Sequence, residues 1–118
     1  MTKTEMGKLD ESYQVILLEQ YDYESILGGE ATLIHHFKLK SEGLSLRWYV
    51  PNGISLNAFQ HNPIHAGSNE GIEFENRIKK IKGKEWLEDL NRQRNKIAKY
   101  LKYEDVLAHI MGVKDNYI

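Results

Sequence analysis

Cysteine is absent from this chain of 118 residues, and so is any long hydrophobic run. Without cysteine the chain can form no disulfide, no thiolate zinc site and no cysteine nucleophile, which fits a reducing cytosol. No apolar stretch approaches the roughly 20 residues that cross a bilayer. The N-terminal residues lack the apolar core of a signal peptide. We therefore expect a cytoplasmic protein that has no membrane partner.

The familiar catalytic motifs are missing as well. The sequence contains no GxSxG, no Walker motif, no HExxH and no glycine-rich dinucleotide fingerprint. Serine, histidine and carboxylate residues are present, but no spacing joins them into a triad. The sequence therefore predicts no catalytic residue and no cofactor, and we expect a protein that is not an enzyme.

The first half of the chain predicts an antiparallel β-meander over residues 13–59. Residues 13–21 are apolar on both faces, and apolar and polar residues alternate over 31–39, 44–50 and 54–59. Turn residues separate these segments: Gly28-Gly29, Ser41-Glu42-Gly43 and Pro51-Asn52-Gly53. Pairing the apolar faces sets Trp48 opposite both His35 and Leu56. We expect about four strands, with one apolar face.

The second half predicts two to three helices. A polar loop over residues 60–69 leads to a first helix, which Ser68 or Asn69 can cap and Gly83 can end. A second helix is expected from Lys84 to Lys102, and a third from about residue 103 to 111. We expect a single α+β domain over residues 1–118, whose helical part (70–112) packs on one face of the sheet.

The basic residues are unevenly distributed. Residues 77–102 contain ten of the sixteen Lys and Arg residues and only three acids, a formal charge of +7, whereas residues 1–30 contain two bases and seven acids. Spacing of four predicts three ion pairs: Glu73–Arg77, Glu75–Lys79 and Glu88–Arg92. On the second helix the remaining bases form a narrow stripe, made of Arg92, Lys96 and Lys99 with Lys102 at its edge. Such a stripe could bind phosphates. The alternative is a solvated helix face, since lysines are ordinarily exposed.

Arg94 does not belong to this stripe. On the helical wheel it lies among the apolar residues of the second helix, so we expect its guanidinium to be buried. A buried guanidinium needs a partner, because leaving it unpaired costs several kcal/mol. The alternatives are an internal ion pair with Glu19 or Asp22, a ligand, or a subunit interface.

The segment between sheet and helices contains His61, Asn62 and His65. The spacing of the two histidines is that of a metal-binding pair on a helix, but Pro63 disfavours helix at the residue before it. We therefore expect a polar loop that hydrogen-bonds with itself. The alternatives are a metal site completed by a glutamate near residue 70, and an anion-binding loop.

A secondary candidate surface lies on the other face of the predicted sheet. Lys38, Arg47, Tyr49 and Phe59 would form a platform on which bases could stack. A covering helix or second subunit would explain the same aromatic residues.

The leading hypothesis is a small non-enzymatic binding protein whose basic C-terminal helix binds nucleic acid or a nucleotide-like phosphate ligand. A homo-oligomer is a possible form of this protein. In this hypothesis the ligand-binding residues are Arg92, Arg94, Lys96, Lys99, Lys102, His61, Asn62 and His65. The first alternative is a protein-interaction module or inhibitor, encoded by a phage or mobile element, that docks on a nucleic-acid-processing or defence protein. The second alternative is a metal-dependent hydrolase that uses the His61/His65 loop.

Overall fold

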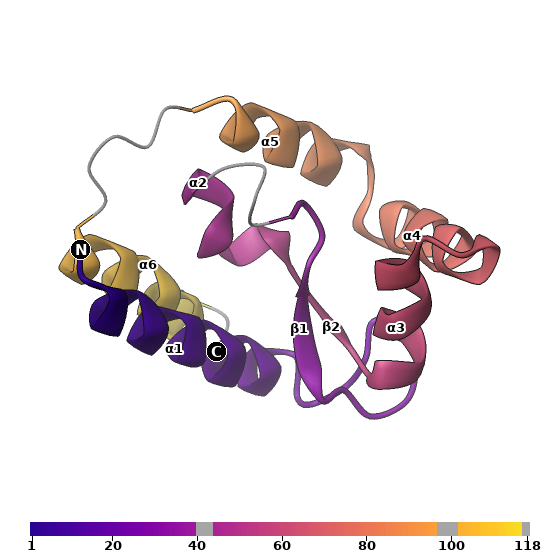
Figure 1. Ribbon diagram of the computed structural model, residues 1–118, viewed down its shortest axis with the longest axis horizontal. Coiled ribbons are helices and arrows are strands. Elements are labelled where there is room, and N and C mark those ends of the chain that lie inside the picture. The colour runs from indigo at the N-terminus through magenta and orange to yellow at the C-terminus, as the bar shows by residue number, and fades with distance from the viewer. Residues whose placement is uncertain (40–43, 97–101, 117–118) are drawn as a thin grey trace.

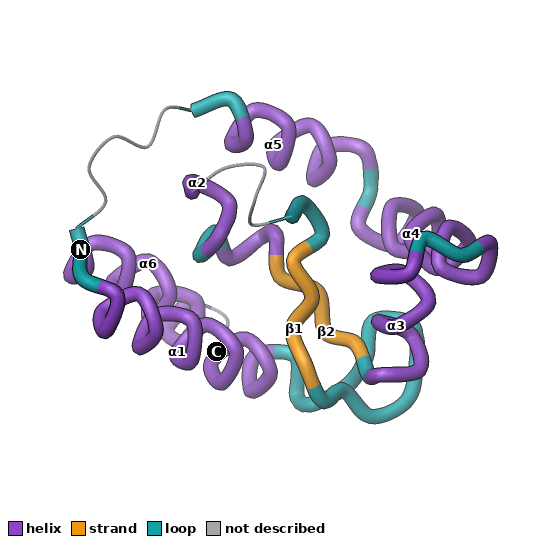
Figure 2. Tube along the Cα trace, in the orientation of Figure 1, coloured by secondary structure: helices purple, strands orange, loops and turns teal. Residues whose placement is uncertain are grey.

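The computed structural model describes residues 1–39, 44–96 and 102–116, and most of these are helical (Figure 1). The described residues form six α-helices and one two-stranded antiparallel sheet (Figure 2). The prediction of a four-stranded meander with two to three helices is therefore wrong. The elements are α1 (Lys3–Gln20), β1 (Leu33–His36), α2 (Leu44–Arg47), the 3-10 turn η2 (Val50–Asn52), β2 (Gly53–Leu56), α3 (Ala58–Ala66), α4 (Asn69–Lys82), α5 (Lys84–Arg94) and α6 (Tyr103–Asn116).

Helix α1 occupies the region where the first strand was predicted. A capping box starts it, because the Thr2 hydroxyl accepts a hydrogen bond from the Glu5 amide at 3.1 Å and the Glu5 carboxylate accepts one from the Thr2 amide at 2.8 Å. Leu9, Tyr13 and Leu17 are buried at a spacing of four residues, which places them on one side of the helix. The prediction of a strand over residues 13–21 is therefore wrong.

The sheet pairs β1 with β2, and the predicted pairing of neighbouring segments is wrong. Leu33 lies opposite Leu56, and His35 lies opposite Ile54. At one end of the ladder is Gly53, where a Cβ atom would collide with the Leu17 side chain. A glycine at this position allows α1 to cross close to the sheet.

Residues 44–50, which predicted a strand, instead form α2 and lead into η2. The fully buried side chain of Asn52 takes the place of a strand partner for Lys38. Its Oδ1 atom accepts from the Lys38 amide at 2.8 Å, and its Nδ2 atom donates to the Lys38 carbonyl at 2.9 Å. The backbone groups that would extend the ladder beyond β1 are thereby satisfied by one side chain. The turn predicted at residues 41–43 lies outside the described residues.

Two apolar clusters hold the helices together. The first joins α1 to α6, which lie side by side (Figure 1), through the buried residues Leu9, Tyr13, Leu17, Ile34, Trp48, Val106 and Ile110. The second lies between the sheet, α3 and α4 and contains Ile54, Leu56, Ile64 and Ile78. Both sides of the small sheet region are therefore covered by helices.

The polar loop predicted over residues 60–69 is wrong, because α3 occupies most of it. Asn57 and Gln60 form a capping box at its start, and Pro63 lies inside the helix. Helices α3 and α4 approach so closely at Gly71 that a Cβ atom there would collide with the Pro63 carbonyl. This tertiary packing stabilises a helix that proline disfavours locally.

The later helices agree with the sequence prediction in part. Helix α4 begins after the cap Ser68 and ends at Gly83, as predicted. Helix α5 ends at Arg94, and α6 continues through Gly112 to Asn116, so the predicted ends of both helices are wrong. None of the helices in the described ranges is both long enough and apolar enough to cross a membrane.

Candidate functional site

Exposed cations follow one another along α4 and α5. Among the described residues from Arg77 to Lys96, the exposed Lys and Arg residues are Arg77, Lys79, Lys80, Lys84, Arg92, Arg94 and Lys96, and we call this set the α4–α5 basic surface. The same stretch holds only three acids. The two helices are separated by a single residue, Gly83, so these cations are distributed over one continuous part of the fold.

The acids neutralise this surface weakly. Lys84 pairs with Glu88 at 3.7 Å and Arg92 pairs with Asp89 at 3.6 Å, and the side chains of the two cations are 88% and 67% exposed. Exposed pairs of this kind contribute about 0–1 kcal/mol, because water and salt screen them. The cations therefore retain most of their attraction for an external anion.

The three ion pairs predicted from spacing are not formed in the part of the chain that the structure describes. Arg77 lies over the Phe74 ring, 6.0 Å from its centroid, and Arg92 pairs with Asp89 instead of Glu88. The side chains choose neighbours three residues away, which is equally close on a helix. Arg77 and Lys79 therefore belong to the basic surface.

Arg94 is exposed, so the prediction that its guanidinium is buried is wrong. The neighbouring Gln93 makes the contact with α2 instead, where the Ser45 hydroxyl donates to its carbonyl at 2.8 Å. Leu90 is the buried residue of α5, and the helix ends before the apolar arc that was predicted around Arg94 can form. Of the other predicted stripe residues, Lys96 and Lys102 are exposed and Lys99 lies outside the described residues.

Helix α5 is fixed to the rest of the fold through Tyr49. The Tyr49 hydroxyl donates to a carboxylate oxygen of Asp89 at 2.6 Å. Burial, together with this hydrogen bond and the negative charge of Asp89, raises the pKa of Tyr49 to about 12. The contact sets one side of α5 against η2 and leaves the side with Arg92 exposed.

The two histidines of the predicted loop lie one turn apart on α3. The rings of His61 and His65 stack with centroids 5.8 Å apart, and the ring of His35 meets His61 edge-on at 5.1 Å. Burial, and then the charges of the other histidines, lowers the pKa of His35 to about 4. Burial and the charge of His65 lower the pKa of His61. This arrangement favours the neutral forms of His35 and His61.

Within the residues that the structure describes, no three side chains of His, Cys, Asp or Glu are grouped so that they could hold a metal ion. The glutamates suggested near residue 70 do not complete a site with His61 and His65. Asn62 is exposed beside them. Figure 1 also shows α3 far from the C-terminal end of α5, so one chain does not bring these residues together with Arg94 and Lys96.

The secondary candidate surface is not assembled, because the described residues do not form the four-stranded sheet on which it was predicted. Arg47 donates to both carboxylate oxygens of Asp10, at 3.0 and 2.6 Å. Tyr49 is held by α5, and Lys38 follows β1. Phe59, which is 88% exposed, lies on α3. These four predicted residues share no common face.

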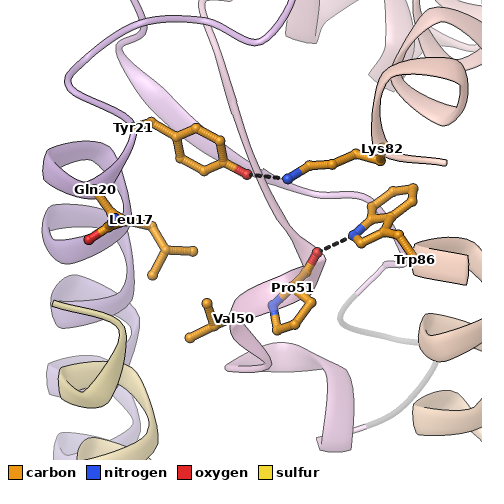
Figure 3. Close-up of a pocket in the computed structure, with 7 residues that line it drawn as sticks. All are labelled: Leu17, Gln20, Tyr21, Val50, Pro51, Lys82 and Trp86. Carbon is orange, nitrogen blue, oxygen red and sulfur yellow. Dashed lines mark hydrogen bonds between the residues drawn. The ribbon is translucent and has the colours of Figure 1, made fainter. Parts of the chain in front are cut away.

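A pocket that the sequence did not indicate lies where α1, η2 and the α4–α5 junction meet (Figure 3). It has a volume of about 240 Å³, and Leu17, Tyr21, Val50, Pro51, Lys82 and Trp86 are among the residues that line it. These residues come from three separate parts of the sequence. No local sequence pattern could have joined them.

The described side chains form three features that a ligand could contact. The side chains offer an exposed basic surface, a set of histidine rings in contact with one another and a small pocket with a lysine at one end. Comparison of the chain with protein-family models, curated proteins and solved structures finds no match.

Proposed function

We propose that this chain is a non-enzymatic binding protein whose α4–α5 basic surface engages the phosphate backbone of a nucleic acid. The observation that carries the proposal is the excess of exposed cations on two consecutive helices. Seven exposed Lys and Arg side chains follow one another there, and the ion pairs of Lys84 with Glu88 and of Arg92 with Asp89 are exposed and long. An internal structural role would require closer and better buried partners.

Phosphate binding by such a surface depends on the release of counterions. Each phosphate that is neutralised on double-stranded DNA adds about −0.9 to the slope of log K against log salt, and each on a single strand about −0.7. If about four of the cations contact phosphates at once, affinity should fall roughly 100-fold between 50 and 200 mM salt. The binding should depend little on base sequence, because phosphate contacts do not distinguish bases.

The test is fluorescence anisotropy with labelled single- and double-stranded oligonucleotides at several salt concentrations. Lys80 and Lys96 are exposed, one on α4 and one just after α5. The double variant Lys80→Glu, Lys96→Glu should weaken binding at least tenfold, because it replaces two attractive charges with repulsive ones.

The matched control is Lys3→Glu with Lys8→Glu, two exposed lysines of α1, because this pair changes the net charge by the same amount. The control should bind like the unmodified protein. Equal losses in both double variants, or an affinity that does not change with salt, would refute the proposal. Either result would favour the protein-interaction alternative.

A further inference from the structure

The pocket beneath the α4–α5 junction has an apolar wall and a charged end (Figure 3). Leu17, Val50 and Pro51 contribute aliphatic surface, and Trp86 contributes its indole. The indole N–H already donates to the Pro51 carbonyl at 2.6 Å, and the ring packs against Phe37 with centroids 4.8 Å apart. Trp86 is therefore fixed in orientation and offers a ligand apolar ring surface.

The charged end is set by a chain of hydrogen bonds. The Tyr21 hydroxyl donates to the Gly53 carbonyl at 2.8 Å, so its oxygen acts as the acceptor for the Lys82 ammonium, which lies 3.0 Å away. The same ammonium lies 5.3 Å from the centroid of the Tyr21 ring. Both contacts hold Lys82 at the pocket.

Lys82 has no carboxylate partner within the described part of the chain. An ammonium group has three N–H donors, and Tyr21 accepts from one of them. The half-buried ammonium thus brings a positive charge and further donors to the edge of an apolar pocket. A ligand that matches both features carries one anionic group next to a hydrocarbon body.

The volume limits the size of that body. A cavity of about 150 Å³ accommodates benzene, whereas pockets for drug-sized ligands begin at about 300 Å³. The pocket, at about 240 Å³, suits one ring with a short side chain. We propose that it binds a small aromatic monocarboxylate, with the carboxylate at Lys82 and the ring against Trp86 and Pro51.

This site is independent of nucleic-acid binding by the α4–α5 basic surface, because Lys82 is not part of that surface. The probe for the test is 3-phenylpropanoate, and its matched neutral analogue is 3-phenylpropanamide. Binding is followed by ¹H–¹⁵N NMR of the Trp86 indole N–H. The indole of the buried Trp48, which donates to Asp10 at 2.9 Å, serves as an internal reference.

The carboxylate should shift the Trp86 resonance in a saturable manner, with a Kd on the order of 0.1–1 mM for so small a ligand. The amide should bind about tenfold more weakly, because its carbonyl accepts from the ammonium without the negative charge that a carboxylate adds. Lys82→Met should weaken carboxylate binding by a similar factor and leave amide binding unchanged. Lys80→Met, at an exposed position on the same helix, is the control and should bind both compounds like the unmodified protein.

Equal affinity for the carboxylate and the amide in the unmodified protein would overturn the proposal without reliance on any variant. So would a Trp86 resonance that does not shift, or a loss of carboxylate binding in Lys80→Met as large as that in Lys82→Met. The last result would show a general attraction of anions to the helix. Nucleic-acid binding that survives Lys82→Met would separate this site from the α4–α5 basic surface.

Discussion

Acidification should destabilise this protein through His35. The side chain of His35 is 7% exposed, lies on β1 opposite Ile54 and meets the His61 ring at 5.1 Å. Burial, and then the charges of His61, His36 and His65, lowers its pKa from 6.5 to about 4. The folded state therefore favours neutral His35, whereas the unfolded chain accepts a proton at the ordinary pKa.

The direction and size of the effect follow from these two pKa values. The contribution of His35 to stability is complete above pH 6.5 and is lost as the pH falls toward 4. The two values differ by about 2.5, which corresponds to about 3 kcal/mol over the whole range. Between pH 7.5 and pH 5.0 the loss attributable to His35 should be about 2 kcal/mol, a large part of the stability of a small domain.

The assay is urea unfolding of the unmodified protein and of His35→Leu at pH 7.5 and 5.0. Burial lowers the pKa of His61 and of His109 as well, so these residues also make the protein less stable in acid. The decisive quantity is therefore the difference between the two proteins in the free energy lost on acidification. His65→Leu, at an exposed position, is the control. If His35→Leu loses as much stability as the unmodified protein, the reasoning is wrong.

Two further predictions concern packing and ion pairing, and both are measured by chemical denaturation. Gly71→Ala should cost about 2 kcal/mol, because its Cβ atom would collide with the Pro63 carbonyl and separate α3 from α4. Gly7→Ala in α1, where nothing lies within 4 Å, should instead stabilise the protein by up to about 1 kcal/mol; two effects of the same sign would contradict the argument. Asp10→Ala should cost about 2 kcal/mol, because Asp10 accepts hydrogen bonds from Arg47 and the adjacent tryptophan. A double-mutant cycle of Asp10 and Arg47 should give a coupling of about 1 kcal/mol, and a coupling near zero would show that the pair is dispensable.

The sequence identified α4 because its signals are local. Ser68 provides the cap, Gly83 ends the helix, and the apolar spacing lies between them. Helix α1 has equally local signals in its capping box and in the four-residue spacing of Leu9, Tyr13 and Leu17. The β-branched and aromatic residues from 13 to 21 favour a strand locally and compete with that spacing. The burial of the helical stripe formed by Leu9, Tyr13 and Leu17 outweighs the strand propensity of residues 13–21.

The sheet could not be predicted correctly from alternation alone. Residues 44–50 alternate in burial as a strand would, with Leu46 and Trp48 buried, yet they form α2 and the turn before η2. What replaces the expected strand is the buried side chain of Asn52, whose partner Lys38 is distant in sequence. Because a single buried amide side chain makes these hydrogen bonds, the sequence shows no periodic pattern that would predict them.

The candidate sites show the same division between local and distant information. Charge counting located the basic stretch, and Lys96 is exposed just after α5. The helical wheel placed Arg94 wrongly, because the extent of the apolar arc depends on where α5 ends. The pocket at Lys82 and Trp86 requires segments separated by more than sixty residues, so it emerges only from the tertiary structure.

The packing of α1 against α6 has a consequence for biosynthesis. Val106 and Ile110 cover the α1 face that contains Leu9 and Tyr13, but they lie about 90 residues further along the chain. At a translation rate of about 5–20 residues per second, the nascent chain presents that apolar face without its partner for roughly 5–20 s. Holdase chaperones bind unfolded segments whose apolar surface stays exposed during synthesis, and the apolar face of α1 is such a segment. Emergence of α6 from the ribosome, rather than emergence of α1, is then the step at which this fold can close.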